Sequence, residues 1–117
     1  WYADSGLIAA VIGIYVAALS GKKLSELRKQ YTTYFGIPET NFEVDDKLRA
    51  IERVKLAFPD ATVDHMDGAT LELPDGTWLN LRPSNTESIL RLNAESHKQA
   101  RLDEIVAIVK SQITSTE

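Results

Sequence analysis

The sequence predicts an α+β fold, in which an antiparallel sheet carries helices on one face and follows a helical N-terminal segment. From Thr40 onward the residue pattern reads strand, helix, four strands, helix, an order typical of α+β architectures. Short turn signals separate the four consecutive strand-like segments, as expected of hairpin-connected strands. The 117 residues, 44% of them hydrophobic, suffice for one core of ordinary domain size.

The N-terminal segment predicts two helices. Residues 6–19 are almost entirely apolar, and Asp4 and Ser5 before them offer N-cap oxygens. A membrane span needs roughly 20 apolar residues, so we interpret this stretch as a helix buried within a larger protein and expect no membrane association. Apolar side chains at helical spacing predict a second helix over residues 23–34, followed by a linker at residues 36–38.

The remaining elements are expected in a regular order. They are a strand at 40–44, a helix capped by Asp45 or Asp46 and ending near Phe58, strands at 61–65, 69–73, 77–81 and 89–94, and an amphipathic helix at 100–113. Asp64, His65 and Asp67 form a compact group that suits a metal ion, but Asp67–Gly68 is also a strong hairpin signal. We favour the turn.

Composition excludes several classes of function. The formal net charge of −4 argues against binding to nucleic acid or to anionic membranes, because those partners select basic surfaces. The chain has no cysteine, which excludes disulfides and thiolate metal sites and fits a reducing compartment. We therefore expect a cytoplasmic protein without nucleic-acid or membrane partners.

The most informative stretch is Arg82 to Glu87, which places a guanidinium, two hydroxyls and an amide in a turn between two strand-like runs. Pro83 lacks an N–H group, so the chain must leave the preceding strand there. An arginine fork and successive backbone N–H groups in a turn both suit a phosphomonoester. On this chemistry alone, a hydrophilic hairpin loop with a solvated arginine remains the alternative.

Other candidate residues carry weaker signals. Trp78 lies on a predicted strand and is either a core residue or a sugar-facing one, of which we favour the core. His97 has no nearby nucleophile or partner acid in the sequence, so we expect it to be solvated rather than catalytic. Glu87 either contacts a substrate hydroxyl or pairs with Arg91 on the same strand face.

The run RPSNTESILRLNAES resembles the C-terminal signature of the phosphohexomutases, specifically the phosphomannomutase/phosphoglucomutase group. The segments ADSGLIAA, GKKLSEL, TNFEV, IERVK and VDHMDG resemble that group in the same order. Asn85 is similar to the mannose and glucose mutases, whereas the related phosphoglucosamine mutases usually have glycine there. Ser88 departs from the group's usual proline, so we expect a looser end to the loop.

The resemblance implies two domain segments. Residues 1–36 would be the helical tail of a third domain with its linker, and residues 37–117 a fourth, phosphate-binding domain. The fourth domain of the family is similar in outline to the TATA-binding protein, a likeness that carries no DNA function. By the same resemblance, the substrate phosphate is held by Arg82, Ser84, Asn85 and Thr86, with Glu87 as a candidate substrate contact.

The resemblance also implies a parent enzyme that interconverts hexose 1-phosphate and hexose 6-phosphate, of mannose or glucose, through a bisphosphorylated sugar. Its catalytic serine loop and Mg²⁺ loop would lie outside the matched region. We therefore expect this chain to be a fragment without catalytic or metal-binding residues, inactive alone and working with the parent's other domains. The alternative is a noncatalytic interaction or regulatory module that docks a partner through the apolar helix at residues 6–19, which we expect to present a hydrophobic patch.

Overall fold

The computed structural model describes residues 4–114, which form two units divided between Thr33 and Tyr34. The first unit contains helix α1 (Gly6–Ser20) and helix α2 (Leu24–Tyr31). Helix α1 begins after Ser5, whose side chain accepts a hydrogen bond from the N–H of Ile8, and ends at Gly21 in the left-handed conformation. Both boundaries follow ordinary capping rules.

Neither α1 nor α2 buries a side chain. Large apolar side chains of α1 such as Leu7, Ile14 and Leu19 are more than two-thirds exposed. Helix α1 therefore presents an apolar surface, as the sequence predicts. Within residues 4–114 no single helix has the length and apolar character to cross a membrane, and α1 with α2 meets that test only as a pair bent by 105°.

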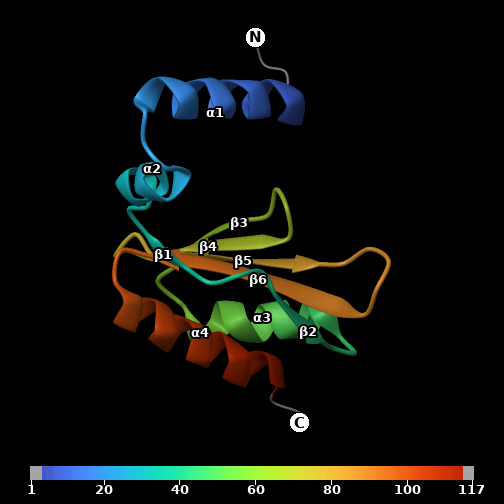
Figure 1. Ribbon diagram of the computed structural model, residues 1–117. Coiled ribbons are helices and arrows are strands. Elements are labelled where there is room, and N and C mark those ends of the chain that lie inside the picture. The colour runs from blue at the N-terminus through green and yellow to red at the C-terminus, as the bar shows by residue number, and fades with distance from the viewer. Residues whose placement is uncertain (1–3, 115–117) are drawn as a thin grey trace. The chain divides into compact units, whose positions relative to one another are not determined.

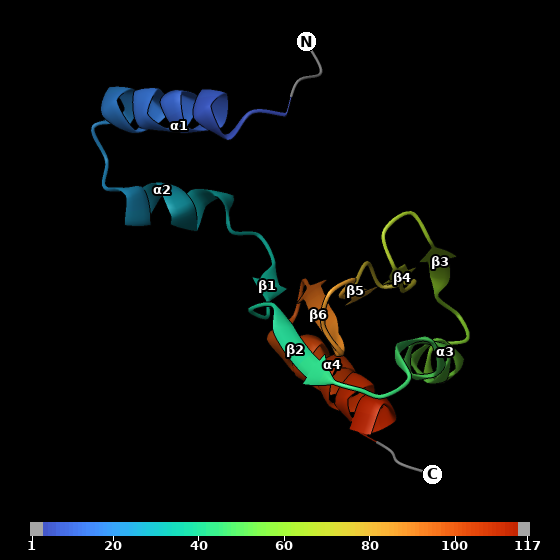
Figure 2. The ribbon, with the colours of Figure 1, turned by 90° about the vertical axis from the view of Figure 1, so that its right-hand side faces the viewer.

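The second unit is an antiparallel sheet with two helices on one face (Figure 1). Its elements are β1 (Phe35–Gly36), β2 (Thr40–Glu43), α3 (Lys47–Ala57), β3 (Thr62–Asp64), β4 (Ala69–Glu72), β5 (Trp78–Pro83), β6 (Ile89–Ser96) and α4 (Gln99–Thr114). The strand order is β1-β6-β5-β4-β3, with β2 also paired to β6. Figure 2 shows α3 and α4 on the same side of the strands. The predicted α+β fold class is confirmed.

Strict alternation along β5 and β6 separates the core from the other face of the sheet. Leu79 and Leu81 of β5 and Leu90 and Leu92 of β6 are fully buried, because period-2 geometry points them all toward the helices. Their neighbours in sequence point the other way and form cross-strand pairs. We call this second set the polar sheet face, and it comprises Trp78, Asn80, Arg82, Arg91, Asn93 and Glu95.

The structure corrects two sequence interpretations in this unit. Trp78 lies on the polar sheet face, opposite Glu95, and not in the core, because Leu79 takes the core-facing position next to it. Gly36 is part of β1 and pairs with Glu95, and the N–H of Ile37 donates to the carbonyl oxygen of Ala94 in β6 at 3.2 Å, so the predicted linker is hydrogen-bonded to the sheet at both residues.

The turn predicted at Asp67–Gly68 is confirmed. Gly68 has φ +75°, and a β-carbon built there would lie 2.3 Å from the carbonyl oxygen of Leu81. Only glycine fits a position that combines a positive φ with so close a backbone neighbour. The turn thereby brings Asp67 next to β5, where the candidate site begins.

Candidate functional site

The site is built on the polar sheet face where β5 and β6 approach their connecting loop. Register places Arg82 of β5 directly opposite Arg91 of β6. Like charges facing each other across two strands are destabilising unless anionic groups lie nearby. The structure therefore raises the question of which anions accompany this arginine pair.

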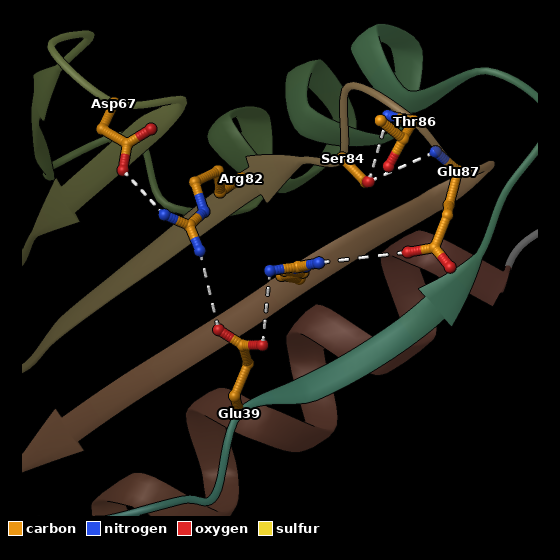
Figure 3. Close-up of polar contacts among 7 residues, drawn as sticks. Glu39, Asp67, Arg82, Ser84, Thr86 and Glu87 are labelled. Atoms are coloured by element: carbon orange, nitrogen blue, oxygen red, sulfur yellow. Dashed lines mark hydrogen bonds and ion pairs between the residues drawn. The ribbon is translucent and has the colours of Figure 1, made fainter.

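Three carboxylates surround the two guanidinium groups (Figure 3). Glu39 contacts both, with one oxygen 3.8 Å from Nη2 of Arg82 and the other 3.8 Å from Nη1 of Arg91. Asp67 lies 3.3 Å from Arg82, and Glu87 lies 4.0 Å from Arg91. The pairs made by Glu39 and Glu87 are long, the Arg82–Asp67 pair is also a hydrogen bond, and all are partly exposed, so each contributes little stability.

The loop between β5 and β6 carries the other predicted donors. Ser84 is buried, and its Oγ accepts long hydrogen bonds from the N–H groups of Thr86 and Glu87, at 3.4 and 3.3 Å. Asn85 and Thr86 are exposed. The predicted turn is thus a compact loop whose hydroxyl and amide side chains lie just beyond Arg82, on the same connection.

Sequence reasoning missed three residues at this site. Arg91 was considered only as a partner of Glu87, yet it faces Arg82 and its Nε is buried without a hydrogen-bond partner. Glu39 and Lys47 are distant in sequence from the loop and carried no signal of their own. Lys47, from the start of α3, donates to the carbonyl oxygens of Ser84 and Glu87 at 2.7 and 3.0 Å.

The other sequence candidates lie outside this arrangement. Asp64 accepts a hydrogen bond from the N–H of Met66 within the β3–β4 turn. Within residues 4–114, His, Cys, Asp and Glu side chains form no group of three or more that suits a metal ion. The exposed ring of His97 lies against Tyr34, with ring centroids 4.5 Å apart.

A separate electrostatic contact fastens the β4–β5 turn to α4. The pKa of Asp75 lies below its ordinary value, mainly because the backbone N–H of Thr77 donates to its carboxylate at 2.9 Å. The guanidinium of Arg101 adds a charged hydrogen bond at 2.8 Å. Asp75 and Arg101 therefore have a structural role, because they hold the β4–β5 turn to α4. None of the side chains of the loop between β5 and β6 takes part in this contact.

Comparisons with known proteins match the chain to one family. Residues 39–112 match the family model described as phosphoglucomutase/phosphomannomutase, C-terminal domain. The chain is 34% identical over 116 residues to a phosphomannomutase of Methanocaldococcus jannaschii, covering 99% of this chain and 26% of the relative. It is 38% identical over 105 residues to phosphohexose mutases of Xanthomonas campestris, covering 86% of this chain and 23% of the relative.

Two further matches have the same extent. A phosphoglucosamine mutase of Pediococcus pentosaceus is 34% identical over 114 residues, covering 92% of this chain and 23% of the relative. A crystal structure of a phosphoglucomutase/phosphomannomutase family protein from Burkholderia thailandensis aligns with a TM-score of 0.56 and 23% identity, covering 80% of this chain and 21% of that one. The structural match supports the fold. The chain spans about a quarter of the length of the relatives it matches.

Proposed function

The chain belongs to the phosphoglucomutase/phosphomannomutase family, and on this premise we propose that its second unit binds the phosphate group of a hexose phosphate. The observation that carries the proposal is the position of Glu39. Its carboxylate lies between Arg82 and Arg91, with one oxygen near each guanidinium. An anion with two or more oxygens therefore has a place between these side chains.

A phosphomonoester suits this place better than a carboxylate does. It carries about −1.5 to −2 charges at pH 7 and three acceptor oxygens, whereas Glu39 offers one charge and two oxygens. Two guanidinium forks match phosphate geometry through paired N–H donors. The hydroxyls of Ser84 and Thr86 and the amide of Asn85 supply further donors from the adjacent loop.

In the proposed reaction the loop between β5 and β6 binds a phosphate group of the substrate and does not transfer it. A larger mutase would interconvert hexose 1-phosphate and hexose 6-phosphate through a bisphosphorylated sugar, and this unit would hold the phosphate that is not reacting. Binding energy from that remote group would orient the reacting end of the sugar. We assign the catalytic serine and Mg²⁺ to the rest of such an enzyme, as the family resemblance implies.

The proposed substrate is mannose or glucose phosphate. Asn85, the position where the resemblance separates these sugars from glucosamine phosphate, supports this choice. The relatives named as mutases include both phosphomannomutases and a phosphoglucosamine mutase. The proposed preference for mannose or glucose phosphate therefore depends on Asn85 alone. Glu87 is the proposed contact to a sugar hydroxyl, for which its weak 4.0 Å pair with Arg91 would open.

The test is an NMR titration of the ¹⁵N-labelled chain with mannose 1-phosphate, and with free mannose as the ligand control. We expect amide shifts confined to residues 82–88 that appear only with the phosphate. Arg82→Ala should weaken binding by about 1.5–3 kcal/mol, because charged hydrogen bonds are lost. Arg28→Ala, on α2, removes the same charge elsewhere and should bind normally. Equal affinity in the Arg82→Ala and Arg28→Ala variants would refute the proposed site.

A further inference from the structure

Lys47 occupies a position that helix electrostatics disfavour. It is the first residue of α3, whose first turn contains no acidic residue. The positive end of the helix dipole lies there, so a lysine at this point is opposed by about 0.3–1 kcal/mol. Lys47 is nevertheless half-buried rather than extended into solvent. Its contacts must therefore account for its placement.

Among the described residues, the hydrogen bonds of its ammonium group are made with the loop between β5 and β6. The ammonium group donates to the carbonyl oxygen of Ser84 at 2.7 Å and to that of Glu87 at 3.0 Å. Hydrogen bonds from a charged donor are about twice as strong as neutral ones. Lys47 thus joins the start of α3 to both ends of the four-residue segment 84–87.

Because the peptide group is planar, the two hydrogen bonds from Lys47 also fix the direction of the neighbouring backbone N–H groups. In a trans peptide the carbonyl and the following N–H point in opposite directions, and no cis peptide occurs among the described residues. Fixing the carbonyls of Ser84 and Glu87 toward Lys47 therefore directs the N–H groups of Asn85 and Ser88 away from it. Within residues 4–114, neither of these N–H groups has a hydrogen-bond partner.

We propose that Lys47 is a positioning residue for phosphate binding: it holds the loop carbonyls so that the N–H groups of Asn85 and Ser88 face the phosphate of a hexose phosphate. The ammonium also polarises both peptide groups, which strengthens their N–H groups as donors. This inference rests on the proposed function of the same loop. Lys47 itself lies on the carbonyl side and does not contact the ligand.

The experiment compares three variants of the chain by ¹⁵N NMR titration with mannose 1-phosphate. Lys47→Met removes the ammonium, Lys47→Arg keeps a charged donor, and Lys110→Met makes the same charge change on an exposed part of α4. Lys47→Met removes a disfavoured charge from the start of α3, so that helix should persist. The amide spectrum of each free variant reports folding directly.

We expect Lys47→Met to weaken phosphate binding about tenfold, with at least half of that loss recovered in Lys47→Arg and less than a twofold change in Lys110→Met. Hydrogen exchange and ¹⁵N relaxation of residues 84–88 should also show a more mobile loop in free Lys47→Met. The ratio between wild type and Lys47→Met should persist from 0.05 to 0.5 M KCl, because a held loop conformation is not screened by salt.

Three results would overturn the inference. Equal affinity of Lys47→Met and Lys110→Met would show that the loop is positioned without Lys47. If wild type and Lys47→Met bound phosphate equally well at high salt, Lys47 would act only by long-range electrostatic attraction. Failure of the wild-type chain to bind mannose 1-phosphate at residues 82–88 would remove the proposed function and this inference together, whereas the first two results leave the proposed function intact.

Discussion

Glu39 lies between Arg82 and Arg91, where the proposed site would hold phosphate, so its charge should compete with phosphate. The change Glu39→Gln keeps the size of the side chain and removes the charge. At 3.8 Å each ion pair amounts to about 1 kcal/mol in bulk water. Because all three side chains are 31–42% exposed, we discount this to about 0.5 kcal/mol per pair.

Removing both pairs therefore relieves about 1 kcal/mol of competition, which corresponds to about fivefold tighter phosphate binding. The free energy of unfolding should fall by no more than about 1 kcal/mol, since the same weak pairs are lost from the folded state. Titration with mannose 1-phosphate at low salt measures the affinity, and urea denaturation measures the stability.

Glu43→Gln is the matched control for this prediction. Glu43 is the last residue of β2, the strand that begins directly after Glu39, is exposed, and has no ion pair among the described residues. Both variants change the formal net charge from −4 to −3. If the two variants bind phosphate equally well, the effect is one of general charge and the competition argument fails. Weaker binding by Glu39→Gln would mean that the carboxylate orients the arginines instead.

Two further predictions concern stability. Gly68→Ala should cost roughly 2–4 kcal/mol in urea denaturation, because the new β-carbon combines a positive φ with a clash against Leu81. Gly76→Ala has a similar φ of +79°, but its β-carbon would meet only the His97 ring at 3.6 Å, an ordinary van der Waals contact, so it should cost only about 1 kcal/mol. Equal losses would contradict the steric reasoning. Asp75 has a lowered pKa, so its contribution is present above the ordinary carboxyl value and is lost as the pH falls through the folded-state pKa. Asp75→Asn should therefore be less stable than wild type at pH 7, with a difference that shrinks below about pH 4, and a difference unchanged down to pH 2 would show that the carboxylate charge is not the cause.

The elements that the sequence predicts well are those whose signals are local. Alternating leucines around Leu79 and Leu92 specify which face of β5 and β6 is buried, and glycine at position 68 marks a required turn. β1 was not predicted because a strand of two residues is too short to show a periodic pattern, and only its pairing with β6 defines it. Trp78 was misplaced because aromatic size suggested burial, while its position in the alternation assigned it to the polar sheet face.

The site divides in the same way. The residues from Arg82 to Glu87 are contiguous, so the sequence alone predicts a phosphate-binding loop there. That function stays a prediction. Arg91 requires the hairpin register, because only the pairing of β5 with β6 places it opposite Arg82. Lys47 lies 37 and 40 residues from Ser84 and Glu87, and Glu39 lies 43 and 52 residues from Arg82 and Arg91. No local pattern reports such contacts, and they depend on the packing of the whole unit.

The balance of charge at the site bears on which ligand it would select. Two guanidinium groups face three carboxylates, so the free site is already close to neutral. A monoanion that displaced Glu39 would gain little, because it would replace one single charge by another. A phosphomonoester with about two charges would gain from the exchange and would also engage the loop donors that the carboxylate does not reach. Displacing Glu39 costs a carboxylate ligand and a phosphomonoester about the same, so the two guanidinium groups and the loop donors would favour the dianionic phosphate. Glu39→Gln should therefore tighten the binding of both ligands without reducing that preference.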